Sequence, residues 1–198
     1  MIKIEDVISN VQVYGLEESI KRSKYPKSVD ISELDCEITP GIIKLAQCEK
    51  GTGHDNWLNG VIVQFDLTLT VKAWVEAERY HFLDFISSQS TMHKIAFFDL
   101  DESYIEYVDE RMIEIMKEKV AIYNENPTDE NYLKLLYSNP CGFRLTAGMT
   151  TNYRQLKTMY AQREYHRLPE WPAICRWIKT LPMSYLITGK KGKENETK

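Results

Sequence analysis

The chain has 198 residues, 43% of them hydrophobic and 27% charged, and its formal net charge at pH 7 is −4. This composition is typical of one globular domain, and the slightly acidic balance excludes the basic field that a nucleic-acid backbone would need. Short apolar runs interrupted by charges exclude a membrane span, and acidic residues follow Met1 where a signal peptide needs an apolar segment. We therefore expect a cytoplasmic protein that binds neither membrane nor nucleic acid.

The first 60 residues predict only short elements. Val11 and Val13 form a brief apolar alternation. An apolar face near 39–49 indicates a short helix, for which Ser32 is a candidate N-cap. The Gly, Asp and Asn residues within 51–56 then indicate a turn.

Residues 61–71 contain the clearest strand of the sequence. Apolar and polar side chains alternate there, so one face is predicted to be buried and the other polar. The apolar residues are Val61, Val63, Phe65, Leu67, Leu69 and Val71. From Ala73 the apolar spacing changes to three or four residues. This change predicts a helix that runs past His81 toward Phe85.

A helical hairpin is predicted over residues 103–138. Its first helix, 103–123, has an apolar stripe opposite acids and lysines, and Asn126-Pro127 ends it. Thr128 is a suitable N-cap for the second helix, which ends near Ser138. The two helices are joined by a short turn, as in an αα-hairpin.

Two more helices are expected at about 151–165 and 169–179, the latter with Pro169 in its first turn. The polar tail at 189–198 mixes both charges and is expected to be disordered. Residues 1–188 are therefore interpreted as a single α+β domain.

The helix expected from Thr151 has polar residues at both ends of an apolar stripe. Asn152, Leu156, Met159 and Arg163 follow at i, i+4, i+7 and i+11 and so share one face. Asn152 and Arg163 would lie roughly 16 Å apart along the axis. This face could clamp an elongated polar ligand, and it equally fits a core stripe whose polar ends are capped or solvated.

The cysteines and histidines show neither a disulfide framework nor a metal site. Cys36, Cys48, Cys141 and Cys175 contain no Cys-x-x-Cys pair, and the four histidines lack metal-ligand spacing. We expect free, partly buried cysteines and no metal. There is also no phosphate-binding glycine loop and no nucleophile elbow.

Three segments resemble motifs of one enzyme family, the flavin-dependent thymidylate synthases. Asn152-Tyr153-Arg154-Gln155-Leu156, six residues and Arg163 resemble its Asn-x-Arg-x-Leu-(x)6-Arg helix. Tyr80-His81-Phe82, seven residues and Ser90 resemble a degraded form of its Arg-His-Arg-(x)7-Ser motif. Gly53-His54-Asp55 resembles its Gly-His-Glu segment. The likeness extends over about residues 10–185.

The resemblance implies a mixed sheet flanked by helices, and a homotetramer with active sites between subunits. It implies a flavoprotein in which His54, His81, Asn152 and Arg154 hold FAD. Arg163 would polarise the pyrimidine carbonyl and Ser90 would line the base pocket, as the catalytic residues. The implied activity is that of a methyltransferase in dTMP biosynthesis, which uses methylenetetrahydrofolate, with NADPH as a further co-substrate, on a deoxyuridine nucleotide.

The sequence departs from the family at the cations that bind phosphate. Tyr80, Phe82, Met92 and Leu136 stand where the family has arginines, and Lys134 is the nearest cation to the last of these. A buried phosphate needs charge-assisted donors, whereas Tyr80 and Phe82 could stack on a planar ring. Two alternatives therefore stay open: a relative that uses a different pyrimidine or nucleoside, and a non-catalytic protein that binds a nucleotide or a partner. Whether the chain is an enzyme is left open too.

Overall fold

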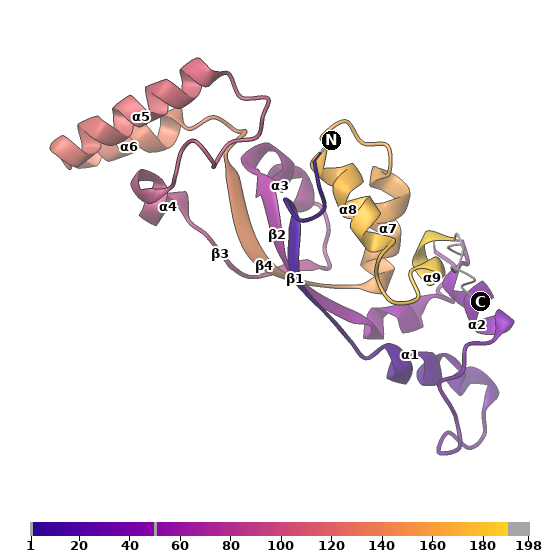
Figure 1. Cartoon of the computed structure of the whole chain (residues 1–198). Coiled ribbons are helices and arrows are strands. Elements are labelled where there is room, and N and C mark those ends of the chain that lie inside the picture. The colour runs from indigo at the N-terminus through magenta and orange to yellow at the C-terminus, as the bar shows by residue number, and fades with distance from the viewer. Residues whose placement is uncertain (1, 50, 190–198) are drawn as a thin grey trace, which may run out of the picture. The chain divides into compact units, whose positions relative to one another are not determined.

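The computed structural model describes residues 2–49 and 51–189 (Figure 1). In chain order the elements are β1 (Ile8–Tyr14), α1 (Leu16–Ser23), α2 (Pro40–Ala46), β2 (Ile62–Thr70), α3 (Val71–Ala77), β3 (Leu83–Ser88), α4 (Thr91–Lys94), α5 (Glu110–Glu125), α6 (Asp129–Ser138), β4 (Arg144–Asn152), α7 (Tyr153–Arg163), α8 (Glu170–Ile178) and α9 (Tyr185–Thr188). Single 3-10 turns occur at Tyr25–Lys27, Asn56–Gly60 and Ile95–Phe97. Apart from Gly189, the tail predicted to be disordered lies outside the described residues. No helix in the described ranges is long and apolar enough to cross a membrane.

The strands form one four-stranded sheet in the order β1-β2-β4-β3. Neighbouring strands are antiparallel, because the number of the contacting residue falls on one strand as it rises on the other. The contacts are Asn10–Asp66 and Gly15–Gly60 for β1 and β2, Thr68–Thr146 and Val71–Phe143 for β2 and β4, and Thr151–Phe82 and Thr146–Gln89 for β4 and β3. The expected α+β fold with a helix-flanked sheet is confirmed, and the strand directions are antiparallel where a mixed sheet was expected.

The chain groups into two compact units, which are described separately. The first unit comprises residues 2–49, 51–66, 80–84 and 149–189. The second unit comprises residues 67–79 and 85–148.

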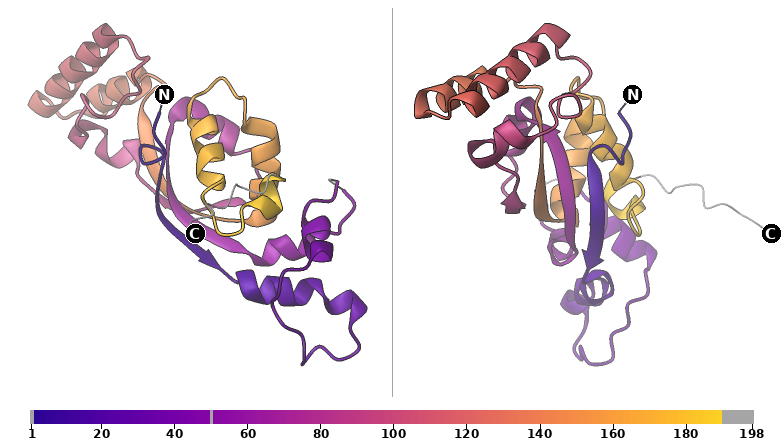
Figure 2. Two further views of the ribbon diagram at one scale, coloured as in Figure 1. Left: turned by 45° about the vertical axis from the view of Figure 1, so that its right-hand side comes forward. Right: turned by 60° about the vertical axis from the view of Figure 1, so that its left-hand side comes forward.

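The core of the first unit lies between its strands and the C-terminal helices. Phe65 of β2 packs against Trp177 of α8, with ring centroids 4.7 Å apart. Leu156 and Met159 of α7 are buried, so the predicted apolar stripe of this helix is confirmed. Figure 2 shows α7 beside α8, and the two helices are in contact. The helix predicted at 169–179 is confirmed as α8.

The second unit contains the predicted helical hairpin. A buried cluster supports it, made of Ile95, Leu100, Tyr104, Met116, Leu135 and Phe143. Thr128 caps α6 as expected, since its side chain accepts a hydrogen bond from the backbone N–H of Asn131 (3.3 Å). The first helix starts later than predicted, at Glu110, because Asp109 caps it and Tyr104 instead pairs with Phe143 in a β-bridge.

Two boundaries around the sheet were predicted wrongly. The helix from Ala73 ends at Ala77, and residues 83–88 form strand β3. The helix expected from Thr151 begins at Tyr153, because Thr151 and Asn152 complete β4. Both strands gain their hydrogen bonds from segments far away in the sequence, which local periodicity does not reveal.

The cap of α2 and the burial of two cysteines also differ from expectation. The cap of α2 is Thr39, whose Oγ1 accepts from the N–H of Ile42 (3.4 Å), and not Ser32. Cys48 and Cys175 are at least partly buried as expected, whereas Cys36 and Cys141 are exposed. All four cysteines are free.

Candidate functional site

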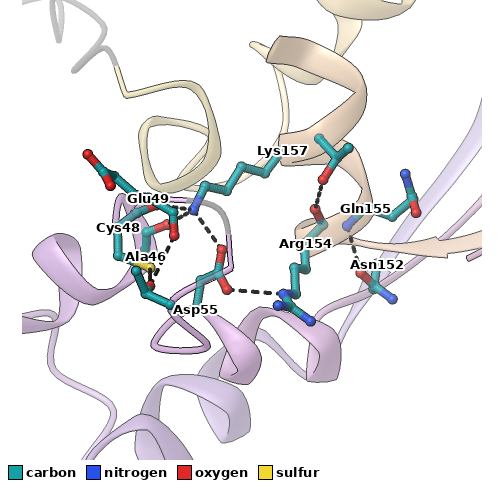
Figure 3. A network of polar contacts seen from close by, with 10 residues as sticks. Ala46, Cys48, Glu49, Asp55, Asn152, Arg154, Gln155 and Lys157 are labelled. Atoms are coloured by element: carbon teal, nitrogen blue, oxygen red, sulfur yellow. Dashed lines mark hydrogen bonds and ion pairs between the residues drawn. The ribbon is translucent and has the colours of Figure 1, made fainter. Parts of the chain in front are cut away.

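A buried carboxylate lies beside the first turn of α7. The side chain of Asp55 is 5% exposed and directly follows His54 in the chain. Nε of Arg154 donates to Asp55 Oδ1 at 3.0 Å, and Nζ of Lys157 donates to Oδ2 at 2.7 Å (Figure 3). A buried carboxylate needs such partners, since leaving one unpaired in a low-dielectric site is costly. The three side chains together carry one net positive charge.

Asn152 occupies the junction between β4 and α7. It has extended backbone angles and its Oδ1 accepts from the N–H of Gln155 at 2.9 Å, as an N-cap does. The residue is 8% exposed. The cap uses the oxygen of this amide, so Nδ2 is the group that Asn152 can offer to a ligand.

Arg163 forms the C-terminal end of α7, where a cation complements the helix dipole. Its Nε donates to the hydroxyl of Tyr80 at 2.8 Å, and that hydroxyl donates to Gln162 Oε1 at 3.1 Å. The Arg163 guanidinium also lies over the ring of Trp171, 4.5 Å from the centroid. These contacts fix the direction of the guanidinium.

The other predicted site residues are not in helices of the first unit. His54 is exposed in the turn before Asp55, and His81 is exposed in the turn that follows Tyr80. Ser90 belongs to the second unit, where it occupies the N-cap position of α4 without a side-chain cap bond. Of these residues, His54 is next in the chain to Asp55, the residue that binds Arg154.

The two aromatic residues that replace the family's arginines differ in their surroundings. Tyr80 is buried and hydrogen-bonded to Gln162 and Arg163, so its ring is not free to stack on a ligand as was expected. Phe82 is 58% exposed, so stacking remains open to it.

Lys157 was missed by the sequence reasoning. It is three residues after Arg154, which places the two cations on neighbouring positions of one helix face. That spacing was the only sequence signal, and it does not reveal the contact with Asp55, because the two residues are 102 positions apart.

Comparison with solved structures identifies the fold. A flavin-dependent thymidylate synthase, ThyX, from Helicobacter pylori, complexed with FAD and dUMP, is 13% identical, with a TM-score of 0.70 over 92% of this chain and 97% of that chain. The UMP/dUMP methylase PolB from Streptomyces cacaoi, bound with 5-Br dUMP, is 14% identical, with a TM-score of 0.61 over 89% of this chain and 93% of that chain. The chain therefore has the fold of the flavin-dependent thymidylate synthases.

Sequence comparison adds no further relative: no model of a protein family matches the chain, and no curated protein matches it. The likeness thus concerns the fold, and the function has to be argued from the site itself.

Proposed function

We propose that this protein binds FAD and a pyrimidine nucleotide or nucleoside through the two ends of α7 and methylates the pyrimidine at C5. The observation that carries the proposal is the arrangement of Asn152, Arg154 and Arg163 on α7 and its cap. These residues keep the spacing of the family motif in a chain with the ThyX fold, and the similar Helicobacter pylori enzyme was solved with FAD and dUMP.

The N-terminal end of α7 suits a flavin. Arg154 uses Nε for Asp55, which leaves its two terminal amino groups as donors toward the carbonyl oxygens of a flavin ring. Asn152 Nδ2 is a second donor, and exposed His54 is a third candidate contact. His81 is included in the flavin site by resemblance. When bound, FAD supplies the redox chemistry, and the protein supplies orientation and electrostatics.

The C-terminal end of α7 suits the pyrimidine. A guanidinium held by Tyr80 and Trp171 is preorganised to donate to a carbonyl oxygen as negative charge builds on it. Arg163 is proposed to act there, and Ser90 is included as a base-pocket residue by resemblance. Methylenetetrahydrofolate is the proposed carbon donor and NADPH the further co-substrate.

Titration with FAD tests the proposal. We expect a shift of the flavin absorption bands and a raised melting temperature, both lost in an Asn152→Ala, Arg154→Ala double variant. Lys179→Met is a matched control, because it removes an exposed cation of the same unit that pairs with half-buried Glu164 (3.1 Å). No spectral or thermal shift at high micromolar FAD would refute the flavin site, and unchanged binding in the double variant would refute its placement.

A second candidate function is the binding of a nucleoside or base that carries no phosphate, either as the substrate of an enzyme or as the ligand of a non-catalytic protein. The observation that favours it is the apolar character of two positions that hold arginine in the family. Met92 is 59% exposed, and Leu136 packs against the buried cluster of the second unit. Neither supplies the charge-assisted donors that a phosphate needs.

A further inference from the structure

The ammonium group of Lys157 has all of its hydrogen-bond capacity in use. It donates to the carbonyl oxygens of Ala46 at 2.7 Å and Cys48 at 2.9 Å, and to Asp55 Oδ2 at 2.7 Å (Figure 3). A lysine ammonium has three donors, so none is left for a ligand. The side chain is 19% exposed, which limits the competition of water for these bonds. Lys157 is therefore built to hold protein groups in place.

The three acceptor groups of Lys157 lie in two segments: the end of α2, and the turn that contains His54. Ala46 is the last residue of α2, where carbonyl groups lack intrahelical partners and a cation is favourable. Cys48 follows just after that end, and Asp55 lies in the turn next to His54. Lys157 thus ties the start of the connection between α2 and β2, and the turn at Asp55 within it, to α7.

The carboxylate of Asp55 is shared between two cations, and this sharing determines what Arg154 can do. Because Lys157 occupies Oδ2, Arg154 engages only Oδ1, through Nε. Without Lys157, a nearly buried Asp55 would have only one cation left. Arg154 would then be drawn into a two-point pair with the carboxylate, which is the geometry that guanidinium and carboxylate prefer.

We propose that Lys157 is a positioning residue for the flavin site, an inference that rests on the proposed function. By occupying one oxygen of Asp55 it leaves the terminal amino groups of Arg154 directed toward the ligand. By holding Ala46 and Cys48 it fixes the connection that carries His54. Lys157 itself does not touch the flavin.

Lys157→Met tests the proposal, because it keeps an unbranched side chain only one atom shorter and removes the charge and all three bonds. In the unliganded protein we expect amide hydrogen exchange within residues 46–49 and 51–56 to accelerate about tenfold or more, with the amides of α8 unchanged. We expect affinity for FAD to fall about tenfold. Lys179→Met should leave both measurements at the wild-type value.

A double-variant cycle separates positioning from a general loss of structure. If Lys157 acts through Arg154, adding Arg154→Ala to Lys157→Met should weaken FAD binding by less than about threefold beyond Arg154→Ala alone. Fully multiplicative effects would overturn the link to Arg154.

The exchange measurement stands apart from the proposed function. If the wild-type protein binds no FAD, the proposed function fails, and exchange within 46–49 and 51–56 still decides whether Lys157 holds that connection. Unchanged exchange in Lys157→Met overturns the positioning role in either case. Faster exchange with wild-type FAD affinity overturns the connection to the ligand.

Discussion

Tyr80 shows how a single residue can change the task of a motif position. The family has an arginine there, whereas Tyr80 is buried and places its hydroxyl between Arg163 and Gln162. A cation that would contact a ligand is thus replaced by an uncharged group that orients the cation at the end of α7. Of the remaining replacements, Phe82 and Met92 are exposed and Leu136 packs against the buried cluster of the second unit, and none of them brings a charge.

Met92→Arg tests whether the missing cations set ligand preference. One charge-assisted contact is worth about 1.5–3 kcal/mol, so we expect deoxyuridine monophosphate to bind the variant roughly ten times more tightly or better. Affinity for deoxyuridine, measured by calorimetry alongside, should not change. Met112→Arg, at another exposed methionine of the second unit, is the control. Low-micromolar binding of the monophosphate by the wild-type protein, with no gain in Met92→Arg, would mean that other cations bind the phosphate.

At the scale of elements, α7 combines a structural and a proposed binding role in its cap. Asn152 Oδ1 satisfies the N–H of Gln155, and Tyr153 N donates to Val61 O at 3.0 Å. The start of α7 is therefore fixed by its Asn152 cap and by the hydrogen bond to Val61, the residue before β2. The position of Arg154 and Lys157 follows from this fixed start, because both lie within the first turns.

Two substitutions of Asn152 should separate these roles. Serine is also a good N-cap but lacks the amide donor, so Asn152→Ser should keep the stability and weaken FAD binding. Asn152→Ala should weaken FAD binding and also lower the free energy of unfolding by about 0.5–2 kcal/mol. Denaturant unfolding and FAD titration measure the two quantities. Thr128→Ala is the control: it removes the cap of α6 and should lower stability without changing FAD affinity. If Asn152→Ser and the wild type bind FAD equally well, Asn152 Nδ2 does not contact the flavin.

At the scale of the whole molecule, a buried thiol and a buried tyrosine hydroxyl predict a loss of stability at high pH. Burial raises the pKa of the Cys175 thiol from 9.0 to about 12 and the pKa of Tyr104 from 10.0 to about 12. The folded protein thus favours the neutral forms, so this stabilisation is complete below the unfolded-state pKa values and is lost as pH rises from about 9 toward 12. We expect the melting temperature to fall across that range.

Cys175→Ala should flatten this pH dependence, because it removes one of the groups that titrates. Cys36→Ala, at an exposed cysteine, should leave the slope unchanged. Melting temperatures at several values between pH 8 and 12 provide the comparison. An unchanged slope in Cys175→Ala would show that its ionisation does not contribute.

Exposed apolar side chains bear on the assembly that we propose for this protein. Apolar side chains of the second unit are exposed on the edge strand β3 and nearby in the sequence: Phe85, Ile86, Met92 and Phe97. An exposed apolar edge strand favours association with another chain. We propose a homotetramer, as the resemblance implies, and a cytoplasmic location. A sedimentation mass near that of one chain, 23.2 kDa, at micromolar concentration would contradict the assembly.

Local patterns were sufficient for several elements and for most of the candidate site. The alternation of 61–71 predicted β2, the Thr128 cap predicted α6, and the motif spacing selected Asn152, Arg154 and Arg163. These features depend on residues a few positions apart, whose relative directions are set by the helix or strand that contains them. The family resemblance of the segments at 53–55, 80–90 and 152–163 predicted the fold, which is confirmed.

The tertiary structure decided what depends on contacts between distant residues. Strand β4 pairs with β2 and β3, and β3 pairs with β4, so both strands depend on distant segments that their own periodicity does not reveal. Asp55 meets Lys157 across 102 positions, and Tyr80 meets Arg163 across 83. A sequence shows which residues carry charge, but the partner that neutralises or orients each charge is chosen only when folding brings distant segments together and removes water from between them.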